Sequence, residues 1–229
     1  MFFKIIHDQK PRKSVFIDEL ATVKDYMQVK DWRGALDVLN MIKMKYPRES
    51  YILPTHYYGM KADVFIAMKE YEKAMNMCLL AIKENQANLF IYNKLVFLEI
   101  ASDDPVKIGR AMVRLDSLLA GEINGIKPDG YSYLNAIRAC CGLGRYADAR
   151  RYVNAVESCY PDMQGKLPIW HTILADKILL TKYPHGLTLT DFFNYNKLAG
   201  YQRNTFFDIV ELLPDWAIKS QNRIPHRLQ

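Results

Sequence analysis

Four arginines lie close together in the second half of the sequence and could bind phosphate groups or acidic protein segments. Arg138, Arg145, Arg150 and Arg151 fall within 14 residues, and a guanidinium can donate two parallel hydrogen bonds to a phosphate or a carboxylate. Charged residues at this density more often form the solvated face of a helix. The sequence therefore allows two interpretations, a solvent-exposed helix face or a contact with phosphate or an acidic partner.

The residue patterns of catalysis and metal binding are missing from the sequence. It contains no glycine-rich phosphate loop, no HExxH motif and no GxSxG motif, and its five histidines are scattered. His171, in an apolar helical stretch, is expected to be a packed or hydrogen-bonded side chain, and Asp103-Asp104 before Pro105 is expected to be a helix cap. We therefore expect no enzyme, no cofactor, no metal site and no small-molecule substrate.

The composition is that of a mildly basic globular protein. The 229 residues, 50% of them hydrophobic, suffice for one sizeable domain or a short repeat array. A formal net charge of +6 is spread along the chain, which permits contact with RNA, anionic lipid or acidic protein and requires none of them. No apolar run is long enough to cross a bilayer.

The four cysteines have no CxxC spacing, and we expect buried, reduced thiols at Cys78, Cys140, Cys141 and Cys159.

The spacing of apolar residues at intervals of three and four predicts helices arranged in pairs. The first helix of each pair is expected at residues 14–30, 55–69, 89–102 and 130–143, with Ser14 as the N-cap of the earliest. Residues 168–181 are expected to form one further helix and residues 190–198 a shorter partner. The second helices share a pattern in which a large apolar residue precedes an alanine by three positions.

This large-x-x-alanine pattern recurs with 39, 37 and 38 residues between successive copies. Residues at i and i+3 share one face of a helix, and the alanine allows two helices to cross closely. The recurrence predicts an all-α, right-handed solenoid of about four to five helical hairpins with an irregular C-terminal cap. The residues expected to pack between the repeats are Trp32, Ala35, Tyr71, Ala74, Ile108, Ala111, Tyr146 and Ala149.

Two stretches resemble known helical-repeat families. EYEKAMNMCLLAIKENQANLFIY resembles a tetratricopeptide repeat, and Gly125 to Ala149 is similar to a pentatricopeptide repeat in its Gly-Ile-Lys-Pro-Asp loop, its Ser132-Tyr133 start and its Gly-Arg turn. RNA-reading pentatricopeptide proteins recognise one base per repeat, with a small polar residue directly after the tyrosine. Here that residue is Leu134, which has no donor or acceptor, so the resemblance does not imply base reading.

The predicted organisation has four parts. Residues 1–13 form a basic extension, 14–161 the helical-repeat array, 162–213 degenerate terminal helices and a cap, and 214–229 a basic tail. Aromatic residues crowd the end of the chain, where they either seal the last hairpin or dock another subunit. The candidates for docking are Phe192, Phe193, Tyr195, Phe206, Phe207 and Trp216.

The resemblance, the basic start and tail and the reduced cysteines together favour a non-catalytic scaffold subunit. Its expected partners are protein subunits, with structural RNA as an additional contact, in an organellar assembly such as the mitochondrial ribosome or a respiratory-chain complex. Two alternatives remain: a free-standing pentatricopeptide-type RNA-binding factor that uses the four arginines, and a tetratricopeptide adaptor that binds peptide tails. The expected location is the mitochondrion, or otherwise the cytoplasm.

Overall fold

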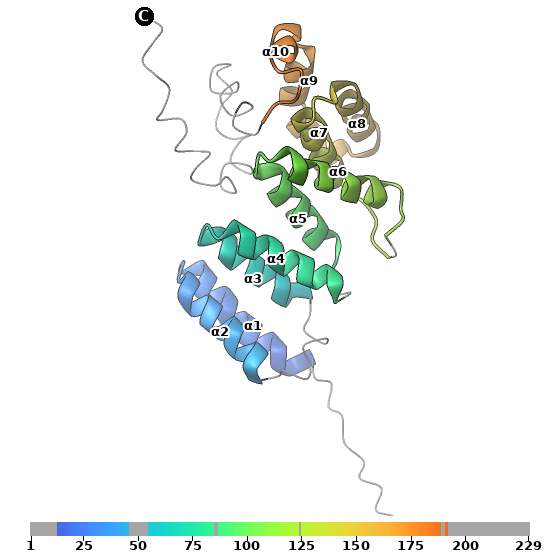
Figure 1. Ribbon diagram of the computed structural model, residues 1–229. Coiled ribbons are helices and arrows are strands. Elements are labelled where there is room, and N and C mark those ends of the chain that lie inside the picture. Colours follow the sequence, from blue (N-terminus) through green and yellow to red (C-terminus); the bar gives the residue numbers. More distant parts are fainter. Residues whose placement is uncertain (1–12, 46–54, 85–86, 124, 189–190, 192–229) are drawn as a thin grey trace, which may run out of the picture. The chain divides into compact units, whose positions relative to one another are not determined.

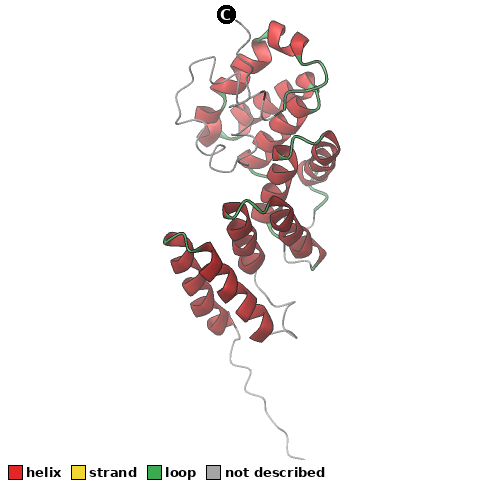
Figure 2. Ribbon diagram, turned by 60° about the vertical axis from the view of Figure 1, so that its left-hand side comes forward, coloured by secondary structure: helices red, strands yellow, loops and turns green. Residues whose placement is uncertain are grey.

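The computed structural model describes residues 13–45, 55–84, 87–123, 125–188 and 191 of the chain (Figure 1). Within these residues the backbone forms helices, turns and loops only (Figure 2), so the expected all-helical class is confirmed. The chain divides into two compact units, Met1–Gln86 and Ala87–Gln229. The boundary therefore falls inside the segment that the sequence pattern assigned to one continuous array.

The first unit contains two helix pairs. α1 spans Lys13–Gln28 and packs against α2, Trp32–Lys45, while α3, Thr55–Ala67, packs against α4, Tyr71–Lys83. α2 also contacts α3, which joins the two pairs. Apolar side chains on the facing sides supply the core, because they leave water where the helices meet. Its completely buried members include Val23, Leu39, Ile42, Ala62 and Val64.

The second unit continues the same neighbour-to-neighbour packing with more helices. α5 packs on α6 and α7, α6 on α7, α7 on α8, and α8 on both the 3-10 helix η2 and α9. The buried apolar side chains of these helices form one continuous core cluster. The elements in chain order are α5 Leu89–Ala101, α6 Pro105–Leu119, α7 Gly130–Gly142, α8 Tyr146–Cys159, η2 Pro161–Lys166, α9 Pro168–Ala175 and α10 Lys177–Lys182.

In each helix pair, the turn between the two helices contains one residue in the left-handed backbone conformation, with positive φ, shortly before the second helix begins. Lys30, Lys69, Asp103 and Gly144 occupy this position, with φ of 60°, 64°, 54° and 70°. In three of the four turns, the N–H of the residue that follows donates to the carbonyl five residues earlier. This hydrogen bond is that of the Schellman motif, which closes helix C-termini. The Asp31 N–H, for example, donates to the Tyr26 carbonyl at 2.9 Å. A shared turn geometry thus underlies the pairing that the sequence pattern predicts.

Lys30 holds this left-handed conformation at the cost of strain, since its Cβ crowds the adjacent carbonyl. Replacing it with glycine removes the strain but increases the entropy of the unfolded chain, and we expect a net gain of about 0.5–1 kcal/mol in unfolding free energy. Urea denaturation of Lys30→Gly and the parent chain measures the difference. Lys30→Ala, which keeps the strain, is the control and should change stability by only a few tenths of that amount.

Side-chain caps explain where several helices begin. The Asp104 carboxylate accepts the N–H of Val106 at 2.9 Å and Pro105 follows it, so the expected cap at this position is confirmed. Asp129 and Ser132 form a reciprocal capping box at the start of α7. Each cap satisfies amide groups that the first helical turn leaves without a backbone acceptor.

The alanines of the recurrent pattern are at points of close packing. Ala35, Ala74, Ala111 and Ala149 are all 0% exposed. Of the large residues three positions earlier, Ile108 is buried and the three aromatic residues are partly buried. A methyl group fills each of these positions completely, so that a larger side chain would have to push neighbouring helices apart.

The structure corrects three local expectations. α1 begins at Lys13, so Ser14 lies inside the helix and is not its N-cap. The single helix expected at residues 168–181 is broken at Asp176, whose carboxylate accepts the Leu179 N–H at 2.9 Å and starts α10 as a separate helix. Cys159 is exposed, whereas Cys78, Cys140 and Cys141 are buried.

Residues 183–188 return to the turn between α7 and α8. The Leu187 N–H donates to the Cys141 carbonyl at 2.8 Å, and the Tyr146 hydroxyl donates to the Tyr183 carbonyl. Gly144 lies beneath this return segment: a Cβ at its position would be 2.5 Å from the Pro184 carbonyl oxygen. The return segment therefore covers the end of the α7–α8 pair.

Candidate functional site

Arg145 and Arg151 share one carboxylate on α8. The Arg145 Nε donates to Asp148 Oδ2 at 2.8 Å, and an Arg151 Nη donates to Oδ1 of the same side chain. The hydrogen bond from Arg151 and then that from Arg145 make the largest contributions to holding the pKa of Asp148 below its ordinary value. Both guanidinium groups remain accessible, since the Arg145 and Arg151 side chains are 45% and 78% exposed.

Arg150 points to a different neighbour. Its guanidinium donates to the carbonyl of Leu174, near the end of α9, and so satisfies one of the acceptors that a helix C-terminus leaves unpaired. It lines an open groove between α8 and α9, together with Asn154 and His171. The His171 Nε2 lies 2.8 Å from a Glu157 oxygen, in agreement with the expected hydrogen-bonded role of this histidine.

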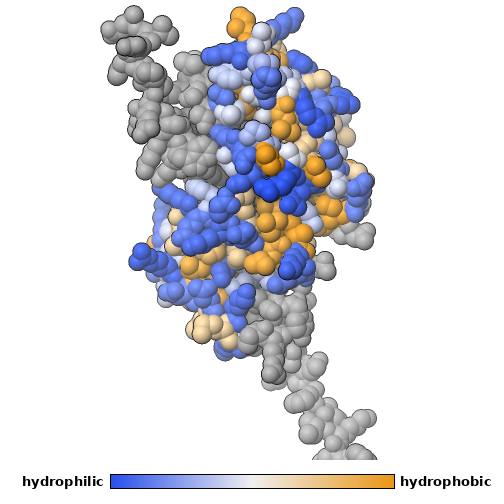
Figure 3. Space-filling model, in the orientation of Figure 1, coloured by the Kyte–Doolittle hydropathy of each residue, from blue (hydrophilic) through white to orange (hydrophobic). Residues whose placement is uncertain are grey.

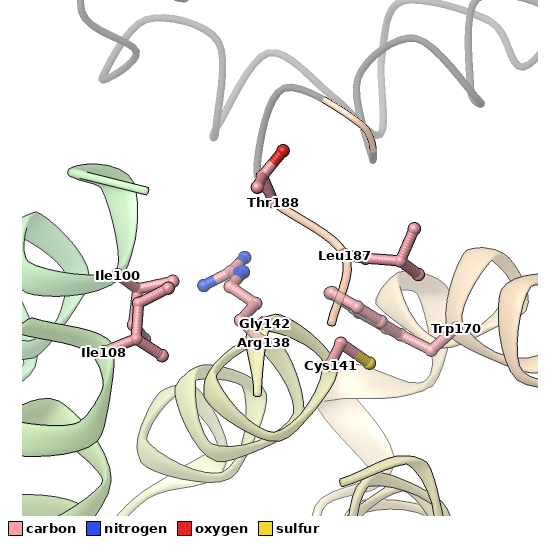
Figure 4. Close-up of a pocket in the computed structure, with 8 residues that line it drawn as sticks. All are labelled: Ile100, Ile108, Arg138, Cys141, Gly142, Trp170, Leu187 and Thr188. Carbon is pink, nitrogen blue, oxygen red and sulfur yellow. The ribbon is translucent and has the colours of Figure 1, made fainter. Parts of the chain in front are cut away.

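Arg138 extends from α7 into a small pocket between Ile100 and Ile108 on one side and Trp170 and Leu187 on the other (Figure 4). The guanidinium donates to Asn135 Oδ1 at 2.8 Å and lies 5.8 Å from the centre of the Phe97 ring. The pocket has a volume of about 20 Å³, enough for about one ordered water molecule. It is too small for a nucleotide base or a peptide side chain of ordinary size.

The four arginines singled out in the sequence therefore do not form one binding site. Arg145 and Arg151 meet on Asp148, while Arg150 contacts α9. Arg138 donates to Asn135 of its own helix and lies over the Phe97 ring of α5. Leu134, the residue at the position that reads bases in pentatricopeptide proteins, is 1% exposed and belongs to the core. The aromatic docking candidates at residues 192–216 lie outside the described residues.

The outer face of α6 carries an apolar surface that the sequence patterns did not single out. Val106 and Val113 are 70% and 67% exposed, and with Gly109, Arg110 and Arg114 they line one shallow depression. Figure 3 shows apolar surface among polar residues in this part of the molecule. The pattern Val-x-x-Gly-x-x-x-Val, opposite the buried positions of α6, was the signal that could have revealed it.

A buried carboxylate organises the basic edge of this face. Glu99 of α5 is 3% exposed, and its oxygens lie 3.3 Å from Arg114 Nε and 3.9 Å from Arg110 Nε. Burial raises the pKa of Glu99 above its ordinary value, and the two arginines counteract that rise. Glu99 thus accepts a hydrogen bond from Arg114 and forms a longer ion pair with Arg110 beside the exposed valines. We call the set Val106, Gly109, Arg110, Val113 and Arg114 the α6 face.

The described residues contain no group of three or more side chains that could hold a metal ion, and none of their helices is long and apolar enough to cross a membrane. Burial raises the pKa of Cys140 to about 11 and shifts that of Cys141 in the same direction, so both thiols stay protonated at neutral pH.

Comparisons with known proteins do not assign the chain to a family. No family model matches the sequence, and neither a curated protein nor a solved structure is significantly similar to the chain.

Proposed function

We propose that the protein is a non-catalytic helical-repeat scaffold that binds other protein subunits, with its helix pairs forming a short solenoid. The single observation that carries this proposal is the α6 face, where two valines are about two-thirds exposed beside two arginines that pair with Glu99. Exposed apolar residues rimmed by charge are typical of protein-binding surfaces, in which arginine is enriched. The recurrent pairing turn and the buried alanines support the solenoid arrangement.

The surroundings we propose for this scaffold are those of a large organellar assembly, such as the mitochondrial ribosome or a respiratory-chain complex. This part of the proposal rests on the resemblance of residues 125–149 to a pentatricopeptide repeat and on the basic beginning and end of the sequence.

Sedimentation of the native protein from an organelle-enriched extract, with and without ribonuclease, tests the proposal. A scaffold subunit sediments rapidly with its assembly. Loss of rapid sedimentation after ribonuclease would indicate a ribosome-like particle, and persistence would indicate an assembly of protein alone. Sedimentation at the size of a monomer in both runs would overturn the scaffold function.

The exposed pair Arg145 and Arg151 favours a second candidate, an RNA-binding factor that contacts phosphates. Replacing Asp148 with asparagine removes the carboxylate that both guanidinium groups share. A phosphate binder should then bind single-stranded RNA about tenfold more tightly at low salt, with a steeper loss of affinity as salt rises. Fluorescence anisotropy with a labelled oligonucleotide measures this, and Asp162→Asn, on η2, is the matched control. Unchanged weak binding would exclude the second candidate.

A further inference from the structure

We draw no further inference here: the strongest candidate, the pair of exposed aromatic side chains formed by Phe90 at the start of α5 and Tyr131 at the start of α7, each with a lysine ammonium group already over its ring, carries nothing because nothing in the structure shows what covers these rings.

Discussion

Gly144→Ala is expected to destabilise the second unit by about 3 kcal/mol, a substantial fraction of the roughly 5–15 kcal/mol by which folded domains are stable. Two effects add at this position. An L-residue at φ 70° carries about 1–2 kcal/mol of backbone strain. The new methyl group would also stand 2.5 Å from the Pro184 carbonyl oxygen, which forces the return segment away from the α7–α8 turn.

Hydrogen exchange followed by mass spectrometry measures this effect where it arises. Amides of α7 and α8 should exchange about a hundredfold faster in Gly144→Ala, while those of α1 and α2 in the other unit should not change. Gly121→Ala is the control, because Gly121 has φ 74° but a Cβ at its position would meet no atom within 4 Å. It should cost only about 1 kcal/mol. Equal effects of the two substitutions would show that the return segment does not press on Gly144.

Ala149→Leu is expected to cost about 3 kcal/mol, because the added atoms enter a packed crossing between helices. Ala149 is 0% exposed and belongs to the continuous core of the second unit. Overpacking of this kind forces side chains out of their preferred rotamers or moves the backbone. Urea denaturation followed by far-UV circular dichroism measures the loss, as a lower midpoint for the second unit.

The same helix provides the control for this substitution. Ala147 is two residues earlier on α8 and is exposed. Leucine has nearly the helix propensity of alanine, so Ala147→Leu should change stability by no more than about 0.5 kcal/mol. If both leucines cost the same, burial of the alanine pattern would not be what holds these helices together.

The helical ranges were predictable because local signals determine them. The first helices expected at 55–69, 89–102 and 130–143 are observed at Thr55–Ala67, Leu89–Ala101 and Gly130–Gly142. Apolar spacing specified the helices, and the cap at Asp104 marked one boundary. The break at Asp176 was harder to predict from the sequence, because the apolar spacing continues through it. Only the aspartate side chain, as an N-cap, marks the start of a new helix.

The candidate site was harder to predict, because it depends on which side chains meet. Arg145, Arg150 and Arg151 are close in sequence, but they project from different sides of the α8 end. Arg150 therefore reaches α9, while the other two reach Asp148. The α6 face combines residues of α6 with Glu99 of α5, and no pattern in the sequence joins them. The exposure of Val106 and Val113 likewise depends on which side of α6 is covered by the neighbouring helices.

The return of residues 183–188 to the α7–α8 turn determines the order in which the second unit can be completed during synthesis. α7 and α8 pair through contacts between residues close in sequence, which form early. The Cys141 carbonyl, by contrast, receives the Leu187 N–H from far along the chain. On the ribosome, the paired helices therefore emerge with this turn still open to water, and the unit closes only after Leu187 has left the exit tunnel.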